Sequence, residues 1–364
     1  MLNASGIKSV TRKLGIDAVG IGSSAPFTDF AKALRSRSDK DLAEIPLIEL
    51  GSELALEAYI DPNITLDGAR SIISISIGYL LEEAPERNGR FIGKVGRAFW
   101  WDAFGELRSR RQLLLEYLER KGINAVAPEA FPHRAAAMRS GVGSFGKNSN
   151  IQTLDYGSWS LITTIVTDLE MEEDEPMGPR CGACRRCLGS CPTKAIIEPY
   201  FVDQSRCISW LLAKKGSIPI HLRELVGERV IGCDVCQEVC PRNWYVIPRK
   251  GEGSEVSFLD LERLCEPGHF FRPHFWGIWG SHLPDDDRLR RNAAVVLGNS
   301  GSPEAVSILE RMLADVSPLV RGHAAWALGK LGGSSSSLAL SDRYRIERDE
   351  QVQWEICQAQ ENIS

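Results

Sequence analysis

Residues 181–192 read CGACRRCLGSCP, which places four cysteines within eleven positions, and residues 232–241 read GCDVCQEVCP, which adds three more. The N-terminal residues, MLNASGIKSVTRKLG, lack the continuous apolar run of a secretory signal, so we expect a cytoplasmic protein. Disulfides are rare in that reducing compartment. The clustered cysteines therefore predict metal or redox chemistry instead of cross-links.

The first run has the spacing C-x2-C-x2-C-x3-C-P, with which bacterial ferredoxins hold 4Fe–4S clusters, the fourth cysteine binding the neighbouring cluster. The second run lacks one cysteine of this pattern, and Cys207, alone in DQSRCISW, can supply it. This crossover assigns one cluster to Cys181, Cys184, Cys187 and Cys240, and the other to Cys191, Cys207, Cys233 and Cys236. Two structural zinc sites are the alternative, but zinc explains neither the C-P endings nor the single cysteine between the runs. Cys265 and Cys357 are expected to be ordinary buried thiols.

Length and composition describe a globular chain. Of its 364 residues 43% are hydrophobic and 25% charged, which suits a full core divided over two or three domains. The net charge of −5 gives no global sign of nucleic-acid binding. Residues 86–121 and 204–250 are locally basic, as expected either for phosphate contacts or for solvated helix faces. No segment reaches the roughly 18 apolar residues of a membrane helix, so we expect no membrane contact.

Residues 1–170 are predicted to form an α/β domain. Short β-branched runs, such as SIISISIGY at 71–79 and SLITTIVT at 160–167, are separated by segments of helical spacing such as 105–122. In 71–79 the alternation of Ile with Ser predicts a strand with two unlike faces.

The rest of the chain divides into three parts. After the acidic, proline-ended EMEEDEPMGP, a cluster-binding segment is expected at 179–250 and an aromatic-rich connector at 251–284, whose rings either pack between domains or stack on unpaired bases. RNAAVVLGNSG at 291–301 then matches GHAAWALGKLG at 322–332 with a period of 31. This repeat predicts HEAT-like helix pairs over 285–364.

The glycine-rich stretch GVGSFGKN at 141–148 satisfies G-x-G-x-x-G. However, HRAAAMRS before it is predicted to be a helix, whereas a dinucleotide-binding loop follows a strand. Asn148 also replaces the hydroxyl residue of a phosphate-binding loop. We therefore interpret the glycines as letting the backbone approach a large planar ligand.

In content and order, HRAAAMRSGVGSFGKN, CGACRRCLGSCPTKAI, IGCDVCQEVCP and RGHAAWALGKLG resemble the epoxyqueuosine reductase family, of which the chain would be a divergent member. The resemblance implies an α+β multidomain protein: a nitroreductase-like α/β cobalamin-binding domain, a bacterial-ferredoxin-like two-cluster domain and C-terminal α-helical HEAT-like repeats. It implies an oxidoreductase with two 4Fe–4S clusters and cobalamin, and we separately expect a monomer. It also implies reduction of epoxyqueuosine to queuosine in a tRNA anticodon stem-loop, with electrons from a donor protein or another reductant. Carried over by position, the residues lining cobalamin would be Arg97, Arg134, Gly143, Gly146, Lys147 and Asn148.

The sequence departs from the family where the catalytic acid is expected. Family members carry an aspartate in a VD-T-G-P-x-x-E-R stretch, whereas this chain has VAPEAFPHR at 126–134, with Ala127 at the aspartate position. Glu129, His133 or Asp102 could deliver the proton instead, although a histidine can serve packing alone and Asp102 could simply cap a helix. Alternatively, the same cofactors reduce a C–O or C–halogen bond of a small molecule. A further hypothesis is a non-catalytic electron-transfer protein.

Overall fold

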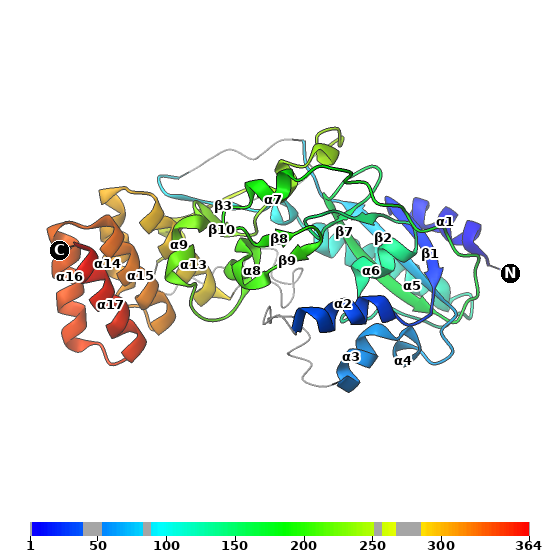
Figure 1. Cartoon of the computed structure of the whole chain (residues 1–364), viewed down its shortest axis with the longest axis horizontal. Coiled ribbons are helices and arrows are strands. Elements are labelled where there is room, and N and C mark those ends of the chain that lie inside the picture. The colour runs from blue at the N-terminus through cyan, green and yellow to red at the C-terminus, as the bar shows by residue number, and fades with distance from the viewer. Residues whose placement is uncertain (1, 39–52, 83–88, 251–256, 267–284, 364) are drawn as a thin grey trace. The chain divides into compact units, whose positions relative to one another are not determined.

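The computed structural model describes residues 2–38, 53–82, 89–250, 257–266 and 285–363 (Figure 1). The chain forms two compact units, each built from separated segments. The first unit comprises residues 1–82, 102–207 and 235–251, and the second comprises 83–101, 208–234 and 252–364. Because of these boundaries, the segment predicted to bind the clusters, 179–250, is divided between the two units.

No helix in the described ranges combines the length and the apolar character needed to cross a bilayer.

A four-stranded antiparallel sheet forms the centre of the first unit. Its order is β1 (Ala18–Ser23), β2 (Ser71–Gly78), β7 (Ser160–Thr167) and β4 (Ala125–Val126). β2 and β7 fulfil the sequence prediction of strands at 71–79 and 160–167. All eight residues of β2 are buried, so its two faces differ in chemistry but not in exposure. The serine face is covered as well, and Ser74 Oγ lies 3.1 Å from Ser140 Oγ.

The helices of the first unit connect and cover these strands. They are α1 (Ala4–Lys13), α2 (Thr28–Ser38), α3 (Glu53–Ile60), α4 (Pro62–Thr65), α5 (Ala103–Glu119) and α6 (His133–Arg139). Both α5 and α6 pack against β2 and β7. α6 approaches β1 so closely that a Cβ on Gly20 would lie 1.8 Å from the Ser140 carbonyl oxygen. Glycine at position 20 is therefore required for α6 to pack on the sheet.

Short elements carry the remaining part of the first unit. A small hairpin of β5 (Ser144–Phe145) and β6 (Ile151–Gln152) follows α6. The cysteine-bearing chain then forms α7 (Arg186–Ser190), β8 (Ile196–Glu198), β9 (Phe201–Val202) and the 3-10 helix η2 (Gln204–Arg206). It returns as α10 (Val235–Glu238) and η3 (Pro241–Asn243). Most of this chain is irregular, as expected for short loops that wrap a cluster.

The second unit begins with a three-stranded sheet and ends with a helical repeat. The sheet order is β10 (Arg229–Ile231), β3 (Ile92–Val95) and β11 (Phe258–Asp260). Three short helices, α8 (Ile208–Ala213), α9 (Ile220–Val226) and α11 (Leu261–Leu264), and the 3-10 helix η1 (Arg97–Phe99) accompany it.

The C-terminal repeat consists of α13 (Asp286–Asn299), η5 (Pro303–Ala305), α14 (Val306–Met312), α15 (Pro318–Leu331), α16 (Gly333–Ile346) and α17 (Glu350–Ile363). The two repeated motifs lie on α13 and α15, which pack on each other, and α17 packs on α15 in turn. At these contacts a Cβ on Gly298 would lie 2.8 Å from Ala327 Cβ, and one on Gly329 would lie 2.6 Å from Ala359 Cβ. The small residues of the repeat therefore allow close helix packing.

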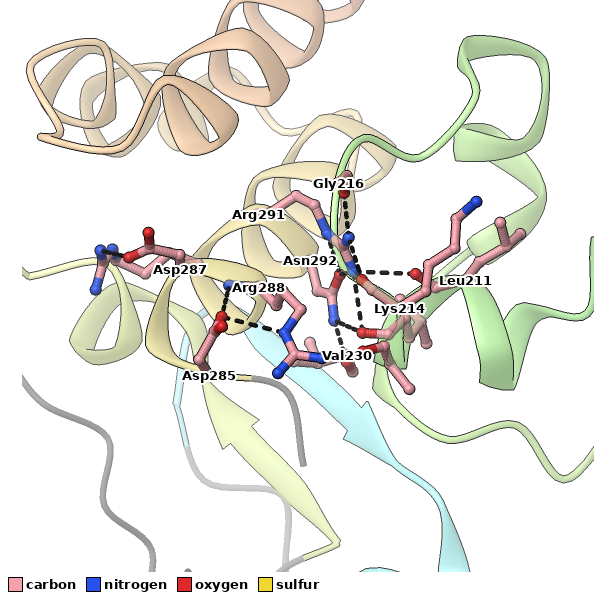
Figure 2. Close-up of polar contacts among 12 residues, drawn as sticks. Leu211, Lys214, Gly216, Val230, Asp285, Asp287, Arg288, Arg291 and Asn292 are labelled. Atoms are coloured by element: carbon pink, nitrogen blue, oxygen red, sulfur yellow. Dashed lines mark hydrogen bonds and ion pairs between the residues drawn. The ribbon is translucent and has the colours of Figure 1, made fainter. Parts of the chain in front are cut away.

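Arg291 and Asn292 join the first repeat helix to the segments around it (Figure 2). The buried Arg291 guanidinium donates hydrogen bonds to the carbonyl oxygens of Leu211, Leu212, Lys214 and Gly216 at 2.6–3.0 Å. Asn292 Nδ2 donates to Leu212 O at 3.0 Å and to Val230 O at 2.8 Å. The side chains of α13 thus donate hydrogen bonds to the last carbonyl oxygens of α8, which have no partner within α8.

Candidate functional site: two cysteine groups and a hollow

The four cysteines assigned to the first cluster lie around one small cavity in the first unit. Cys181, Cys184, Cys187 and Cys240 all line it, together with Lys147, Asn148, Gln152, Arg186 and Pro241. Burial, followed by the charges of Cys181 and Cys240, raises the pKa of the Cys187 thiol to about 11. Thiolates confined in this way repel one another, and bound iron cations would relieve that repulsion. The donor set therefore fits an iron–sulfur cluster.

No three His, Cys, Asp or Glu side chains of the described ranges lie close enough together to hold one metal ion. This is compatible with the thiol-lined cavity, because the corners of an iron–sulfur cube separate their ligands more widely than a single ion does.

The hairpin of β5 and β6 supplies N–H groups to these cysteines. The backbone N–H of Lys147 donates to Cys181 Sγ at 3.4 Å, and Gln152 Nε2 lies 3.6 Å from Cys240 Sγ. Lys147 Nζ also donates to the carbonyl oxygens of Gly182 and Cys184, at 2.7 and 3.0 Å. Such N–H···S contacts stabilise the more negative, reduced state of a cluster and so raise its reduction potential.

Three of the four cysteines assigned to the second cluster belong to the first unit. Cys191 Sγ accepts a hydrogen bond from the Ala195 backbone N–H at 3.3 Å, and Asn150 Nδ2 lies 3.9 Å from Cys236 Sγ. Cys207 follows η2 directly. The fourth, Cys233, belongs to the second unit and comes two residues after β10.

Arg134 has an unusual environment in the first unit. Its side chain is exposed to solvent, yet desolvation by the surrounding protein lowers the pKa of its guanidinium. We call the surroundings of this side chain the Arg134 hollow, as the place where we propose that a cofactor binds. Tyr59, whose pKa is raised by burial, and the thiols of Cys207 and Cys236 lie within electrostatic reach of Arg134. The hollow therefore lies beside two cysteines assigned to the second cluster.

The backbone at the edge of the hollow is shaped for a ligand. Arg134 Nη1 donates to the carbonyl oxygen of Ser149 at 3.3 Å, and Ser149 adopts a left-handed conformation with a φ of 61°. Within the part of the chain that the structure describes, the buried Ser149 Oγ has no hydrogen-bond partner. An uncommon backbone conformation beside an unsatisfied hydroxyl is typical of a ligand site. These features are compatible with a cofactor that binds beside Arg134 and Ser149.

The residues expected to line cobalamin lie in different places. Lys147 and Asn148 direct their side chains to the cysteine-bearing chain, since Asn148 Nδ2 lies 3.4 Å from Cys236 O. A Cβ on Gly143 would lie 2.5 Å from Ile151 Cγ2, so the hairpin itself already requires this glycine. Gly146 is similarly enclosed, with a Cβ contact of 2.8 Å to Asn148 Oδ1.

Arg97, by contrast, belongs to the second unit. Its guanidinium lies 4.7 Å from the centre of the Trp100 ring, and its backbone N–H donates to Asp234 Oδ2 at 2.8 Å. Arg97 therefore lies in a different unit from the other five predicted residues, and the cofactor contacts of all six stay a prediction.

The three candidate acids differ in their surroundings. Glu129 is 86% exposed and pairs with Arg111 at 3.1 Å. His133 is the first residue of α6, and burial lowers its pKa to about 4, so it is neutral at pH 7. Asp102 accepts a hydrogen bond from Gly105 N at 2.6 Å as the N-cap of α5, and its pKa is raised by desolvation. The structure thus assigns a capping role to Asp102 and leaves Glu129 as the exposed carboxylate on the loop before Arg134.

Three further histidine and cysteine side chains have structural surroundings. His323 is buried in the repeat, and its Nε2 accepts a hydrogen bond from Ile218 N at 3.1 Å. Cys265 is buried, and burial raises its pKa to about 12, whereas Cys357 is only partly buried. The predicted aromatic connector lies outside the described residues except for 257–266. Asn150, Gln152 and Tyr59 were missed by the sequence analysis, because no spacing rule links them to the cysteines.

Comparison with known proteins agrees with this arrangement. Residues 180–243 match the 4Fe–4S double cluster binding domain, which contradicts the zinc alternative, and residues 281–360 match HEAT repeats. Together with the fold and the thiol-lined cavity, these matches define a two-cluster iron–sulfur oxidoreductase with a C-terminal helical repeat.

The relatives give the family. The chain is 31% identical over 357 residues to epoxyqueuosine reductase of Bacillus anthracis, covering 94% of this chain and 92% of the relative. It is 31% identical over 369 residues to the enzyme of Bacillus subtilis, covering 95% and 92%. The chain belongs to the epoxyqueuosine reductase family.

Solved structures of this family have the same fold. Epoxyqueuosine reductase from Bacillus subtilis, described with its catalytic aspartate loop swung out of the active site, matches with a TM-score of 0.89 at 28% identity. An epoxyqueuosine reductase structure with an epoxyqueuosine-modified tRNA-Tyr stem loop matches with a TM-score of 0.88 at 28% identity. Each comparison covers 99% of this chain and 98% of the other. The predicted fold class and the predicted 4Fe–4S clusters are thereby confirmed.

Proposed function

We propose that this protein reduces the epoxide of epoxyqueuosine in tRNA to the alkene of queuosine. The observation that carries the proposal is the arrangement of redox groups within the first unit. Four cysteines surround one cavity, and Cys207 and Cys236 lie beside the hollow marked by Arg134. Electrons entering at the first cluster would pass through the second to a substrate at the hollow.

The reaction sets what the site must supply. Conversion of an epoxide to an alkene and water consumes two electrons and two protons, and each cluster passes one electron at a time. When bound in the hollow, cobalamin would supply a strongly reducing cobalt centre for opening the epoxide. Arg134 and the backbone at Ser149 would hold and orient that cofactor, with the Arg134 charge favouring an anionic group next to it.

Glu129 is the proton donor that we propose. It lies on the loop that joins β4 to α6, two residues after Ala127, which stands at the family's aspartate position. In the described conformation Glu129 pairs with Arg111 at the surface. To act as an acid it must leave Arg111 and enter the hollow. His133 is the weaker candidate, because it carries no proton to donate at pH 7 beyond its neutral ring N–H.

We also propose a macromolecular substrate, a cellular location and an oligomeric state. A tRNA anticodon stem-loop is the proposed substrate carrier, supported by the family relative solved with such a stem loop. Since tRNA is modified in the cytoplasm, we place the protein there. A single chain contains all eight cysteines and the hollow, so we propose that it acts as a monomer.

Turnover on modified tRNA tests the proposal. Protein reconstituted without oxygen with iron, sulfide and cobalamin is mixed with dithionite and tRNA bearing epoxyqueuosine, and the nucleosides are separated by mass. We expect queuosine from the parent protein and at least a tenfold lower rate from Glu129→Gln. Asp61→Asn, which alters a helix cap at α4, is the control and should keep the parent rate.

Two other outcomes would redirect the proposal. The presence of Ala127 at the family's aspartate position favours a different substrate with the same cofactors. If fully loaded protein binds cobalamin but converts no epoxyqueuosine, the small-molecule alternative replaces the tRNA function. If it binds no cobalamin at one equivalent while its clusters are intact, the protein is an electron carrier.

A further inference from the structure

The first cysteine group contains the exposed thiol among the eight assigned cysteines. Cys184 is exposed, whereas the other three cysteines around the cavity are partly buried, as are the four of the second group. The hollow at Arg134 lies next to Cys207 and Cys236 of the second group. An electron donor from outside the protein therefore has its most direct access at Cys184.

The chain around this cavity is strongly basic. No Asp or Glu occurs from residue 177 to 197 or from 239 to 250, whereas Arg180, Arg185, Arg186 and Arg242 do. Arg186 lines the cavity, and Arg242 donates to the Arg180 carbonyl oxygen at 2.7 Å, which brings the two cysteine-bearing segments side by side. In the described part of the chain, no carboxylate pairs with Arg186 or Arg242.

Exposed apolar side chains adjoin these charges. Trp244, Tyr245 and Ile247 are 51%, 88% and 82% exposed. Trp244 is held in place, because the Arg186 guanidinium lies 4.7 Å from its ring centre and its Nε1 donates to Glu238 O at 3.1 Å. An ordered tryptophan beside unpaired arginines is typical of the central part of a protein interface.

We propose that Arg186, Arg242, Trp244, Tyr245 and Ile247 form a docking surface for an acidic one-electron carrier protein that reduces the first cluster. The inference rests on the proposed function only in that the clusters must be reduced from outside. A negatively charged carrier complements the unpaired arginines, and the exposed rings bring its redox group close to Cys184. We name these five residues the entry surface.

A protein partner explains the entry surface better than tRNA does. RNA phosphates would use the arginines and unpaired bases could stack on the rings, but Ile247 would be left without a role. The substrate base must also reach the hollow instead of the first cluster. Each encounter oxidises the carrier by one electron and reduces the first cluster from the 2+ to the 1+ state. Two encounters supply the two electrons that one epoxide consumes, and the two protons come from the acid and the solvent.

The test measures reduction of the clusters and needs neither tRNA nor cobalamin. Protein containing both clusters is mixed without oxygen with a reduced, acidic 2Fe–2S ferredoxin, and bleaching of the cluster absorbance is followed by stopped flow. The parent rate should fall steeply with ionic strength. Arg242→Glu should lower the rate at low salt at least tenfold, and Tyr245→Ser should lower it at least threefold.

Three controls make the result specific. Iron per chain is measured for every variant, so that loss of a cluster is not mistaken for loss of docking. Photoreduction by deazaflavin, which needs no docking surface, should proceed at similar rates in all variants. Arg345→Glu, which reverses an arginine that is 75% exposed on α16, should behave as the parent.

The outcomes separate this inference from the proposed function. Equal ferredoxin rates in the parent and in both entry-surface variants would overturn the docking surface, even if queuosine is formed normally. Weaker binding of tRNA to these variants, with unchanged reduction by ferredoxin, would show that the surface serves RNA. Slower reduction by ferredoxin supports the inference whichever substrate the enzyme reduces.

Discussion

The neutral state of His133 predicts a measurable loss of local stability in mild acid. His133 begins α6, where the positive end of the helix dipole opposes a second positive charge. Its Nδ1 is buried and has no hydrogen-bond partner among the described residues. Burial, aided by the Arg111 charge, lowers its pKa from 6.5 to about 4. Between pH 6.5 and pH 4, His133 is therefore protonated in the unfolded chain but neutral in the folded chain.

The magnitude follows from the two pKa values. The stabilisation from a depressed pKa is complete above the unfolded value of 6.5 and is lost as the pH falls toward 4. Between pH 7 and pH 5 the expected loss is about 2 kcal/mol, or roughly a thirtyfold increase in local opening. Gln at this position does not titrate, so His133→Gln should remove the loss.

Hydrogen–deuterium exchange of the α6 amides measures this local opening. Rates at pH 7 and pH 5 are corrected for the intrinsic pH dependence of exchange, and the parent is compared with His133→Gln under identical conditions. Both proteins carry the same clusters, so any acid damage to the clusters cancels in the comparison. An equal pH dependence in parent and variant would refute the buried, neutral histidine and would restore His133 as a candidate acid near neutral pH.

Three other substitutions give further predictions. Gln152→Leu removes the N–H group beside Cys240 Sγ, so spectroelectrochemistry should show the first cluster's reduction potential lower by about 20–60 mV, while iron content stays unchanged. Glu355→Leu leaves Arg223 buried without its bidentate partner, so calorimetric unfolding of the second unit should show a loss of about 3–5 kcal/mol, largely restored when Arg223 is also made Leu. Arg291→Lys keeps the charge but offers three donors in place of five, so the same calorimetry should show a loss of about 2 kcal/mol in the free energy of unfolding. An unchanged unfolding temperature would contradict the anchoring role of Arg291.

The sequence predicted those strands and helices whose signal lies within one short segment of the chain. The β-branched run at 160–167 coincides with β7, and the helical segment expected at 105–122 corresponds to α5 at Ala103–Glu119. The repeat with a period of 31 fell on α13 and α15, because alanine and glycine must recur wherever successive helices touch. In each case the signal lies within one element or one repeat.

Long-range contacts explain what the sequence could not predict. The burial of both faces of β2 depends on α5 and α6, which cover the strand from elsewhere in the chain. The N–H groups offered to Cys181 and Cys240 come from residues 34 and 88 positions away. No rule of spacing connects a glutamine in a hairpin with a thiol at that separation, although the thiols themselves follow a strict spacing.

Contacts within its own hairpin require the glycines of the glycine-rich loop. A Cβ on Gly143 would collide with Ile151 and Gln152, and one on Gly146 would approach the side chains of Asn148 and Gln152, whereas the approach of a planar ligand stays a prediction. That packing directs the Lys147 N–H to Cys181 and Asn148 to Cys236 O, so one loop contacts chain segments of both cysteine groups. Replacing either glycine would displace these donors together. The loop therefore couples the electronic environment of the clusters to the backbone that borders the Arg134 hollow, and this coupling explains why glycines are needed there even without a nucleotide to bind.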